Sequence, residues 1–138
     1  MLLLGVFLDM RTSMNSPFAG FPGVNISNTP VMFGSIGLQT LGVSNPIITL
    51  NGTIGVIGEP GDTFVVELVR GSAYNPQNVI YRAEGTVGEN AGVEFHSFTA
   101  QDLAAPPALE SVYSSFISGV STSVRTGPEM FYGIAATG

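Results

Sequence analysis

The clearest alternation of apolar and polar residues lies between residues 48 and 69. Large apolar side chains keep to even positions, and after a break at 58–62 the side chains of Phe64, Val66 and Leu68 resume the same period. A period of two places one set of side chains on one face of a β-strand. The break reads Gly-Glu-Pro-Gly-Asp, residues that fix φ or allow it to be positive. The pattern predicts two strands joined by a turn in a β-hairpin.

Two paired strands are marginal in water, so other strands must pack with them. Loops rich in Gly, Pro, Ser and Asn separate further segments of strand length, at the spacing typical of sandwiches and barrels. Only residues 101–108 have helical leanings, and two consecutive prolines limit that stretch to one turn. The predicted strands are 31–41, 46–57, 63–70, 78–83, 93–100, 110–120 and 130–137. The sequence therefore predicts an all-β fold.

The first thirty residues follow a different pattern. Residues 1–8 are an apolar segment of strand length, and residues 9–30 are rich in Ser, Asn, Pro and Gly. The apolar run is too short to span a bilayer, and it lacks the basic start of a signal peptide. We predict an N-terminal arm and linker at 1–30 and a β-sandwich domain at 31–138. The alternative is a disordered terminus.

An exposed segment this apolar is an aggregation hazard unless something covers it. Addition to the sheet edge of a neighbouring subunit would cover it, because the main-chain groups of both partners are satisfied while alternate side chains fill pockets. The arm's predicted subunit contacts are therefore its large apolar side chains, namely Leu2, Leu3, Leu4, Val6, Phe7 and Leu8.

Composition supports self-association. The 138 residues, enough for one domain, include ten acids, four arginines and no lysine, with a net charge of −6. Charged residues make up 10% of the chain, against roughly a quarter in an ordinary soluble domain. A surface so poor in charge is weakly defended against association. The absence of a basic cluster argues against nucleic acid or anionic membrane as a partner. The partners we predict are other copies of the chain.

The residues offer little catalytic or metal-binding chemistry. The single histidine, His96, follows Glu94 on one strand face, so a Ser-His-Glu set stays open, but no G-x-S-x-G elbow exists. With no cysteine, disulfides and thiolate zinc sites are excluded. Loop oxygens at 59–62 or 89–90 could hold calcium, yet no twelve-residue ligand loop is present. We predict a protein that is not an enzyme and has no cofactor.

Several segments together carry a resemblance to a known family. They are 50–56, 64–71 and 79–81, then 93–99, and finally 113–116 with 132–136. In this order they resemble the spore-surface jelly-roll proteins of Bacillus and its relatives. That group includes exosporium proteins and the C-terminal head of the collagen-like spore glycoprotein, and it is similar to the tumour-necrosis-factor and complement-head sandwich. The resemblance implies an antiparallel jelly-roll β-sandwich that is non-enzymatic and assembles, often as trimers, on a cell or spore exterior.

Two functions follow as hypotheses. The first is a structural, self-assembling subunit of an extracellular or spore-surface layer or fibre, joined in part by exchange of the N-terminal arm. Other surface-layer or collagen-like proteins are further candidate partners. The second is a trimeric ligand-binding head of the tumour-necrosis-factor type. Its binding surface would be formed by the loops 71–78, 85–92 and 101–110, through Tyr74, Asn75 and Gln101. A viral capsid or appendage jelly roll is a third, weaker class.

Overall fold

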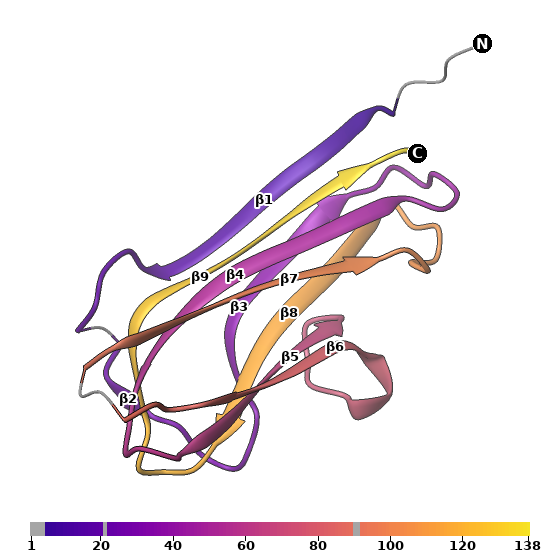
Figure 1. The fold of residues 1–138 in the computed structure, drawn as a ribbon. Coiled ribbons are helices and arrows are strands. Elements are labelled where there is room, and N and C mark those ends of the chain that lie inside the picture. The colour runs from indigo at the N-terminus through magenta and orange to yellow at the C-terminus, as the bar shows by residue number, and fades with distance from the viewer. Residues whose placement is uncertain (1–4, 21, 90–91) are drawn as a thin grey trace.

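The structure is a computed structural model, and it describes residues 5–20, 22–89 and 92–138. Within these residues the chain forms nine strands and one short 3-10 helix (Figure 1). The elements in chain order are β1 (Phe7–Ser16), β2 (Val24–Asn25), β3 (Val31–Gln39), β4 (Ile47–Ile57), β5 (Thr63–Arg70), η1 (Pro76–Asn78), β6 (Val79–Thr86), β7 (Glu94–Asp102), β8 (Glu110–Gly119) and β9 (Val124–Ala136).

The strands form two antiparallel sheets that pack face to face. One sheet has the order β1-β9-β4-β7, with the short β2 also pairing with β9, and the other has the order β3-β8-β5-β6. This interleaving of eight strands between two sheets is that of a jelly roll. The predicted all-β antiparallel jelly-roll sandwich is therefore confirmed.

The predicted hairpin between residues 48 and 69 is wrong. Both of its strands exist, but β4 pairs with β7 and β9, whereas β5 pairs with β6 and β8. The loop at 58–62 carries the chain from one sheet to the other. Alternation shows which face of a strand is buried. Two consecutive strands have the same alternation whether they pair in one sheet or lie in opposite sheets. The pattern therefore located the strands but not their partners.

The core lies between the two sheets. Its largest fully buried side chains include Phe33, Phe64, Phe131 and Tyr113. Phe33 meets the edge of Phe98 across the interface, with ring centroids 6.1 Å apart. The close packing of the two sheets also explains why residue 34 is glycine, since a Cβ there would lie 2.7 Å from the Cβ of Phe131. The core residues are Ile26, Phe33, Ile36, Leu38, Ile48, Leu50, Ile54, Val56, Phe64, Val66, Leu68, Val87, Phe98, Ala100, Ala105, Tyr113, Ile117, Phe131 and Ala135.

Within the predicted arm, residues 7–16 form an edge strand of the protein's own sheet. β1 pairs antiparallel with β9 from Phe7 opposite Ala136 to Ser16 opposite Glu129 (Figure 1). The sequence predicts a linker at 9–30, because β1 beyond Leu8 has few apolar residues to alternate.

Polar side chains of β1 explain how a strand so poor in apolar residues is held. Its inward side chains reach the backbone of β3, the edge strand of the opposite sheet. Asp9 Oδ2 accepts from Gln39 N at 2.8 Å, and Asn15 Nδ2 donates to the Phe33 carbonyl at 2.7 Å. Ser13 Oγ accepts from Ser35 N at 3.4 Å. These bonds join the two sheets at this edge. They also give hydrogen-bond partners to backbone groups of β3 that would otherwise have none in the protein.

A buried ion pair lies near the start of β9. Arg125 donates from Nε and Nη2 to the two carboxylate oxygens of Glu129, at 2.7 and 2.8 Å. The two side chains are 7% and 0% exposed. Asn15 adds a third donor to Glu129 at 3.0 Å. Such a pair is tolerated in a core only when its lone pairs are satisfied in this way. The sequence predicts a loop around Arg125, since a charged residue is seldom fully buried.

Candidate functional site

The predicted contact residues of the arm differ in their surroundings. Leu2, Leu3 and Leu4 lie outside the described residues. Val6 and Phe7 are 57% and 64% exposed, whereas Leu8 is half-buried and packs against the core of its own chain. In this conformation Val6 and Phe7 are therefore available to a second subunit, and Leu8 serves the fold.

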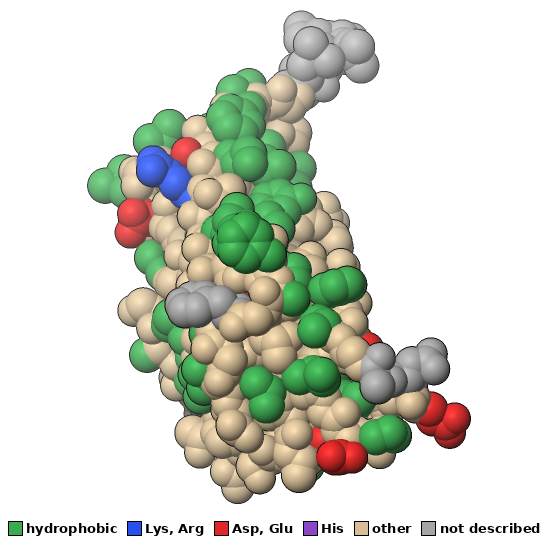
Figure 2. Space-filling model, turned by 90° about the vertical axis from the view of Figure 1, so that its left-hand side faces the viewer, with side chains coloured by type: hydrophobic (Ala, Val, Ile, Leu, Met, Phe, Trp, Pro, Cys, Tyr) green, Lys and Arg blue, Asp and Glu red, His purple; other side chains and the backbone are tan. Residues whose placement is uncertain are grey.

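Exposed large apolar side chains gather on the N-terminal edge of the sandwich. Figure 2 shows this side of the molecule, where hydrophobic side chains run from end to end and charged ones lie mainly toward the margins. We call this set the β1 edge patch. Its members, all exposed, are Val6, Phe7, Met10, Met14, Phe18, Val24, Val31 and Met32. A contiguous apolar patch on a soluble protein typically marks an interaction surface.

The four edge strands are protected to different degrees against pairing with another chain. The backbone of β3 is occupied by side chains of β1. β6 carries the exposed ion pair of Arg82 with Glu84 at 2.8 Å, and charged side chains discourage strand addition. β1 likewise carries the ion pair of Arg11 with Asp9 at 2.9 Å, in which the Arg11 side chain is exposed. β1 and β7 are the two end strands of the β1-β9-β4-β7 sheet.

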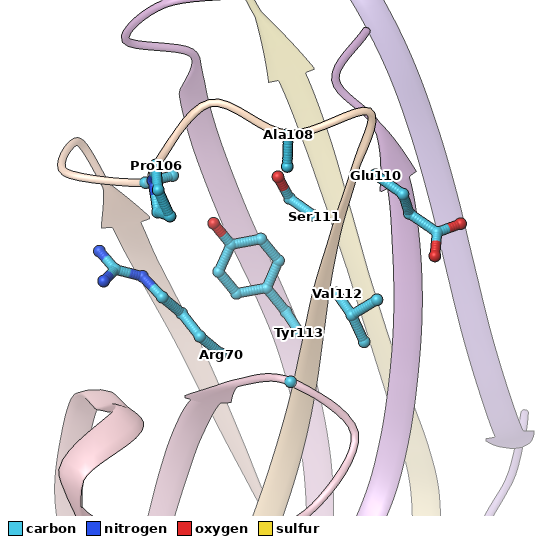
Figure 3. Close-up of a pocket in the computed structure, with 9 residues that line it drawn as sticks. Arg70, Pro106, Ala108, Glu110, Ser111, Val112 and Tyr113 are labelled. Carbon is cyan, nitrogen blue, oxygen red and sulfur yellow. The ribbon is translucent and has the colours of Figure 1, made fainter. Parts of the chain in front are cut away.

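A cavity of about 330 Å³ lies between the end of β5, the start of β8 and the loop between β7 and β8 (Figure 3). Tyr113 stands at its centre, with Arg70 and Pro106 around it, and Glu110 points away. The lining is mostly apolar and comprises Arg70, Gly71, Ala105, Pro106, Ala108, Glu110, Ser111, Val112 and Tyr113.

The polar groups beside this cavity satisfy one another. Arg70 donates from Nε and Nη2 to the two oxygens of Asp102, at 2.7 and 2.6 Å, and the Tyr113 hydroxyl donates to Oδ2 at 2.8 Å. Asp102 Oδ1 also accepts from Ala104 N at 3.2 Å, which fixes the start of the loop. Asp102 and Tyr113 are buried. The network thus anchors the cavity wall, and its members are not free to bind a ligand.

Electrostatics agree with a structural role. Burial by itself would raise the pKa of Asp102, but hydrogen bonds from Arg70 and Tyr113 outweigh it and hold the pKa below its usual value. Burial, reinforced by the bond to Asp102, raises the pKa of the Tyr113 hydroxyl far above its usual range. At neutral pH Asp102 is therefore ionised and Tyr113 is protonated, which is the pairing that the hydrogen bonds require.

Replacing Asp102 with Asn should lower stability most at neutral pH. Because folding depresses the pKa of Asp102, its contribution is fully present above the unfolded-state value of about 4 and is lost as pH falls through the folded-state value. We expect Asp102→Asn to cost about 2 kcal/mol or more at pH 7. The measurement is urea unfolding of both proteins from pH 7 to pH 2. A difference between them that stays constant over that range would contradict the account.

His96 and Glu94, the open candidates for catalysis, do not form a catalytic set. The His96 Nε2 atom lies 3.7 Å from Glu94 Oε2, is buried and has no hydrogen-bond partner among the described residues. The ring packs edge-on against Phe64, with centroids 4.6 Å apart. No hydroxyl is hydrogen-bonded to it within the described chain, so the nucleophile that hydrolytic chemistry needs is not in reach there.

The three loop residues predicted to form a ligand-binding surface do not converge. Tyr74 packs against Phe116 with centroids 5.3 Å apart, on the outer face of the β3-β8-β5-β6 sheet, and donates to Glu67. Asn75 caps η1 by accepting from Gln77 N at 2.9 Å. Gln101 lies on β7 in the other sheet, where it pairs with Thr49. Each of the three residues contacts its own neighbours, and they do not form one shared binding surface.

The described residues were compared with the patterns of a metal-ligand cluster and of a membrane-spanning helix. Over residues 5–20, 22–89 and 92–138, no three His, Cys, Asp or Glu side chains gather as metal ligands would. Asp62, weighed as one of the loop oxygens that could hold calcium, uses Oδ2 to accept from Thr122 at 2.6 Å and from Ser123 at 2.8 Å. No helix among the same residues is long and apolar enough to cross a membrane.

Comparison with known proteins found proteins of similar structure. No family model and no curated protein matches the chain. A structure of Bacillus endospore appendages, which form disulfide-linked pili, matches with a TM-score of 0.47 and 13% identity, over 97% of this chain and 90% of that one. The PRD1 vertex protein P5 matches with a TM-score of 0.49 and 13% identity, over 95% and 97% of the two chains.

A third structure is the Eiger tumour necrosis factor of S. frugiperda, with a TM-score of 0.46 and 11% identity over 94% of this chain and 92% of that one. The chain is thus similar at low identity to an appendage subunit, a viral protein and a tumour necrosis factor. At such identities the similarity concerns the fold alone, and the jelly roll itself is established by the order of the strands.

The sequence pointed to the apolar terminus but not to the surface that extends it. Met10 and Met14 lie in a segment whose alternation is hidden by the polar residues that face β3. Their exposure follows only from the register with β9, in which Met10 is opposite Ile134 and Met14 is opposite Met130. A strand predicted over residues 7–16 would have put both methionines on one face.

Proposed function

We propose that this protein is a non-enzymatic structural subunit that assembles with other copies of itself into an extracellular or spore-surface layer or fibre. The observation that carries the proposal is the β1 edge patch. It comprises exposed residues of the edge strands β1 and β3, of β2 and of the segments next to β1, and it follows the apolar residues 2–4 in the sequence. Burying such side chains stabilises an interface by roughly 25 cal/mol per Å² of apolar surface. The chain's low charge leaves little repulsion to oppose contact.

Sheet geometry supports a repeating assembly. Neighbours in the β1-β9-β4-β7 sheet are all antiparallel, so the two end strands, β1 and β7, run in opposite directions. A second copy translated along the sheet would therefore place its β1 antiparallel beside β7 of the first. Such a head-to-tail contact uses two different surfaces and does not close on itself unless rotation brings it round to a ring.

In this proposal the N-terminal residues extend the interface. Leu2, Leu3 and Leu4 precede the exposed Val6 and Phe7, so a continuous apolar segment is offered to a neighbouring copy. Leu8 holds the segment to its own core. The contact therefore needs no exchange of the whole strand, since β1 can stay in its own sheet while the residues before it reach the next subunit.

Placing charge on the β1 edge patch should block assembly. The double variant Met10→Glu/Met14→Glu puts two carboxylates on exposed positions of β1, and we expect its association constant to fall at least tenfold, about 1.4 kcal/mol. The matched control is Leu103→Glu/Leu109→Glu, which adds the same charge at exposed apolar positions in the loop after β7. Sedimentation velocity compares the two. Equal effects would indicate general repulsion and would count against the patch.

A further inference from the structure

Three rows of side chains cross the outer face of the β1-β9-β4-β7 sheet. Each row contains one residue from each of the four strands. The register defines them because residues paired across strands point to the same side. The rows are Met10–Ile134–Thr49–Gln101, Thr12–Tyr132–Asn51–Thr99 and Met14–Met130–Thr53–Ser97. The alternate residues of these strands, such as Leu50, Phe98 and Phe131, lie in the core, so the rows face outward. No charged residue occurs in them.

The two outer faces of the sandwich differ. The loop before η1 covers the face of the β3-β8-β5-β6 sheet, where Tyr74 packs on Phe116 and Ser114 Oγ donates to the Gly71 carbonyl at 2.7 Å. On the β1-β9-β4-β7 sheet, by contrast, the β7 members Ser97, Thr99 and Gln101 are exposed. The outer face of the β1-β9-β4-β7 sheet is therefore open, and its three rows carry no charge.

A shallow depression of about 170 Å³ lies in the middle of this open face. Tyr132 and Met130 of β9 form one wall, and the shorter side chains of β4 and β7 form the rest. The lining residues are Asn51, Gly52, Thr53, Ser97, Phe98, Thr99, Met130 and Tyr132. Phe98 belongs to the core beneath the depression. The outward side chains combine the Tyr132 ring and the Met130 thioether with neutral amide and hydroxyl groups.

Hydrogen bonds within the rows orient these polar groups. Thr99 Oγ1 donates to Asn51 Oδ1 at 2.8 Å, which directs the Asn51 amide nitrogen away from Thr99, and no described residue accepts from that nitrogen. Gln101 Nε2 donates to Thr49 Oγ1 at 3.3 Å, so the Thr49 hydroxyl keeps its own proton to donate. Asn51 therefore presents free donors next to Tyr132, its neighbour in the row.

From this arrangement we propose that the open face binds a neutral polysaccharide. Sugar hydroxyls both donate and accept, which matches fixed amide and hydroxyl groups, and the apolar C–H face of a sugar ring packs on an aromatic side chain. The lack of charge offers nothing to an anionic or cationic ligand. Rows two residues apart lie roughly 7 Å from each other, so the face accommodates more than one sugar unit. The inference does not require assembly, although a fibre would repeat the site and strengthen binding by avidity.

Native affinity electrophoresis tests this inference with hydroxyethylcellulose, galactomannan and glycogen as neutral probes and polygalacturonate as the anionic comparison. We expect at least one neutral polymer, but not polygalacturonate, to retard the full chain. Tyr132→Ala and Asn51→Ala should each weaken that binding at least tenfold. Thr99→Val, which keeps the shape but frees the Asn51 amide, should weaken it less. The matched control Asn78→Ala, at an exposed position at the end of η1, should bind as the unmodified chain does.

The same experiment can overturn the proposal. Thermal unfolding of each variant checks that the outward substitutions leave the fold intact. If none of the three neutral polymers retards the folded chain, or if Tyr132→Ala binds unchanged, the face is not a polysaccharide site. If Tyr132→Ala instead alters the sedimentation of the protein and not its retardation, the face is a contact between copies and the proposal is equally wrong.

Discussion

Replacing Arg125 with methionine should lower the free energy of unfolding by about 3–5 kcal/mol. The substitution removes both donors that Arg125 gives to Glu129 and leaves a carboxylate with no exposed surface and one remaining donor, Asn15. A buried charge without its partner retains the full cost of leaving water. Chemical denaturation monitored by circular dichroism measures the loss.

Two controls separate the buried pair from a general effect of losing an arginine. Arg82→Met breaks an exposed pair with Glu84 and should change stability little. The double variant Arg125→Met/Glu129→Met removes both charges and should recover most of the loss, because apolar residues of similar volume replace buried pairs at low cost. A double variant as unstable as Arg125→Met alone would mean that the arginine acts through packing.

Removing residues 1–6 should abolish assembly while leaving the domain folded. The deletion takes away Leu2, Leu3, Leu4 and Val6 and keeps β1. If these side chains are buried between copies, each contributes about 1.5 kcal/mol or more, so their loss should weaken association by roughly a thousandfold or beyond. Sedimentation velocity over a concentration series measures the association, and the thermal midpoint reports the fold.

The length of the deletion matters. The sequence suggests removal of residues 1–14 as the test, with the expectation of a folded but unassembled domain, but that deletion takes away most of β1. It removes the Leu8 contact with the core and the Asp9 bond to Gln39, and it leaves β9 without much of its ladder. We expect the longer deletion to unfold. A protein lacking residues 1–6 that associates like the full chain would refute the role of the terminus.

The sequence reveals strand positions better than strand partners. β5 occupies the predicted residues 63–70, and β4 begins within one residue of its prediction. Their alternation is set by one buried face, which is a local property. Partners depend on how the chain crosses between sheets. The loop at 58–62 has the composition of a hairpin turn, yet the structure uses it to change sheets.

Polar contacts account for the elements that pattern reading missed. β1 is held to β3 by Asp9 and Asn15, whose bonds to backbone groups leave no apolar period in the sequence. β9 begins at Val124 rather than at 130, since the buried Arg125 has the appearance of a loop residue. The outer-face rows are also invisible until register is known, because they join residues from four separate strands.

Sedimentation velocity with negative-stain microscopy of the purified full chain would show whether the protein assembles with copies of itself. We expect discrete oligomers or filaments at micromolar concentration that persist at high salt, because the proposed contacts are apolar and the β1 edge patch consists of uncharged side chains. A single species of 14.4 kDa at all concentrations, with no assembled particles in the micrographs, would contradict it.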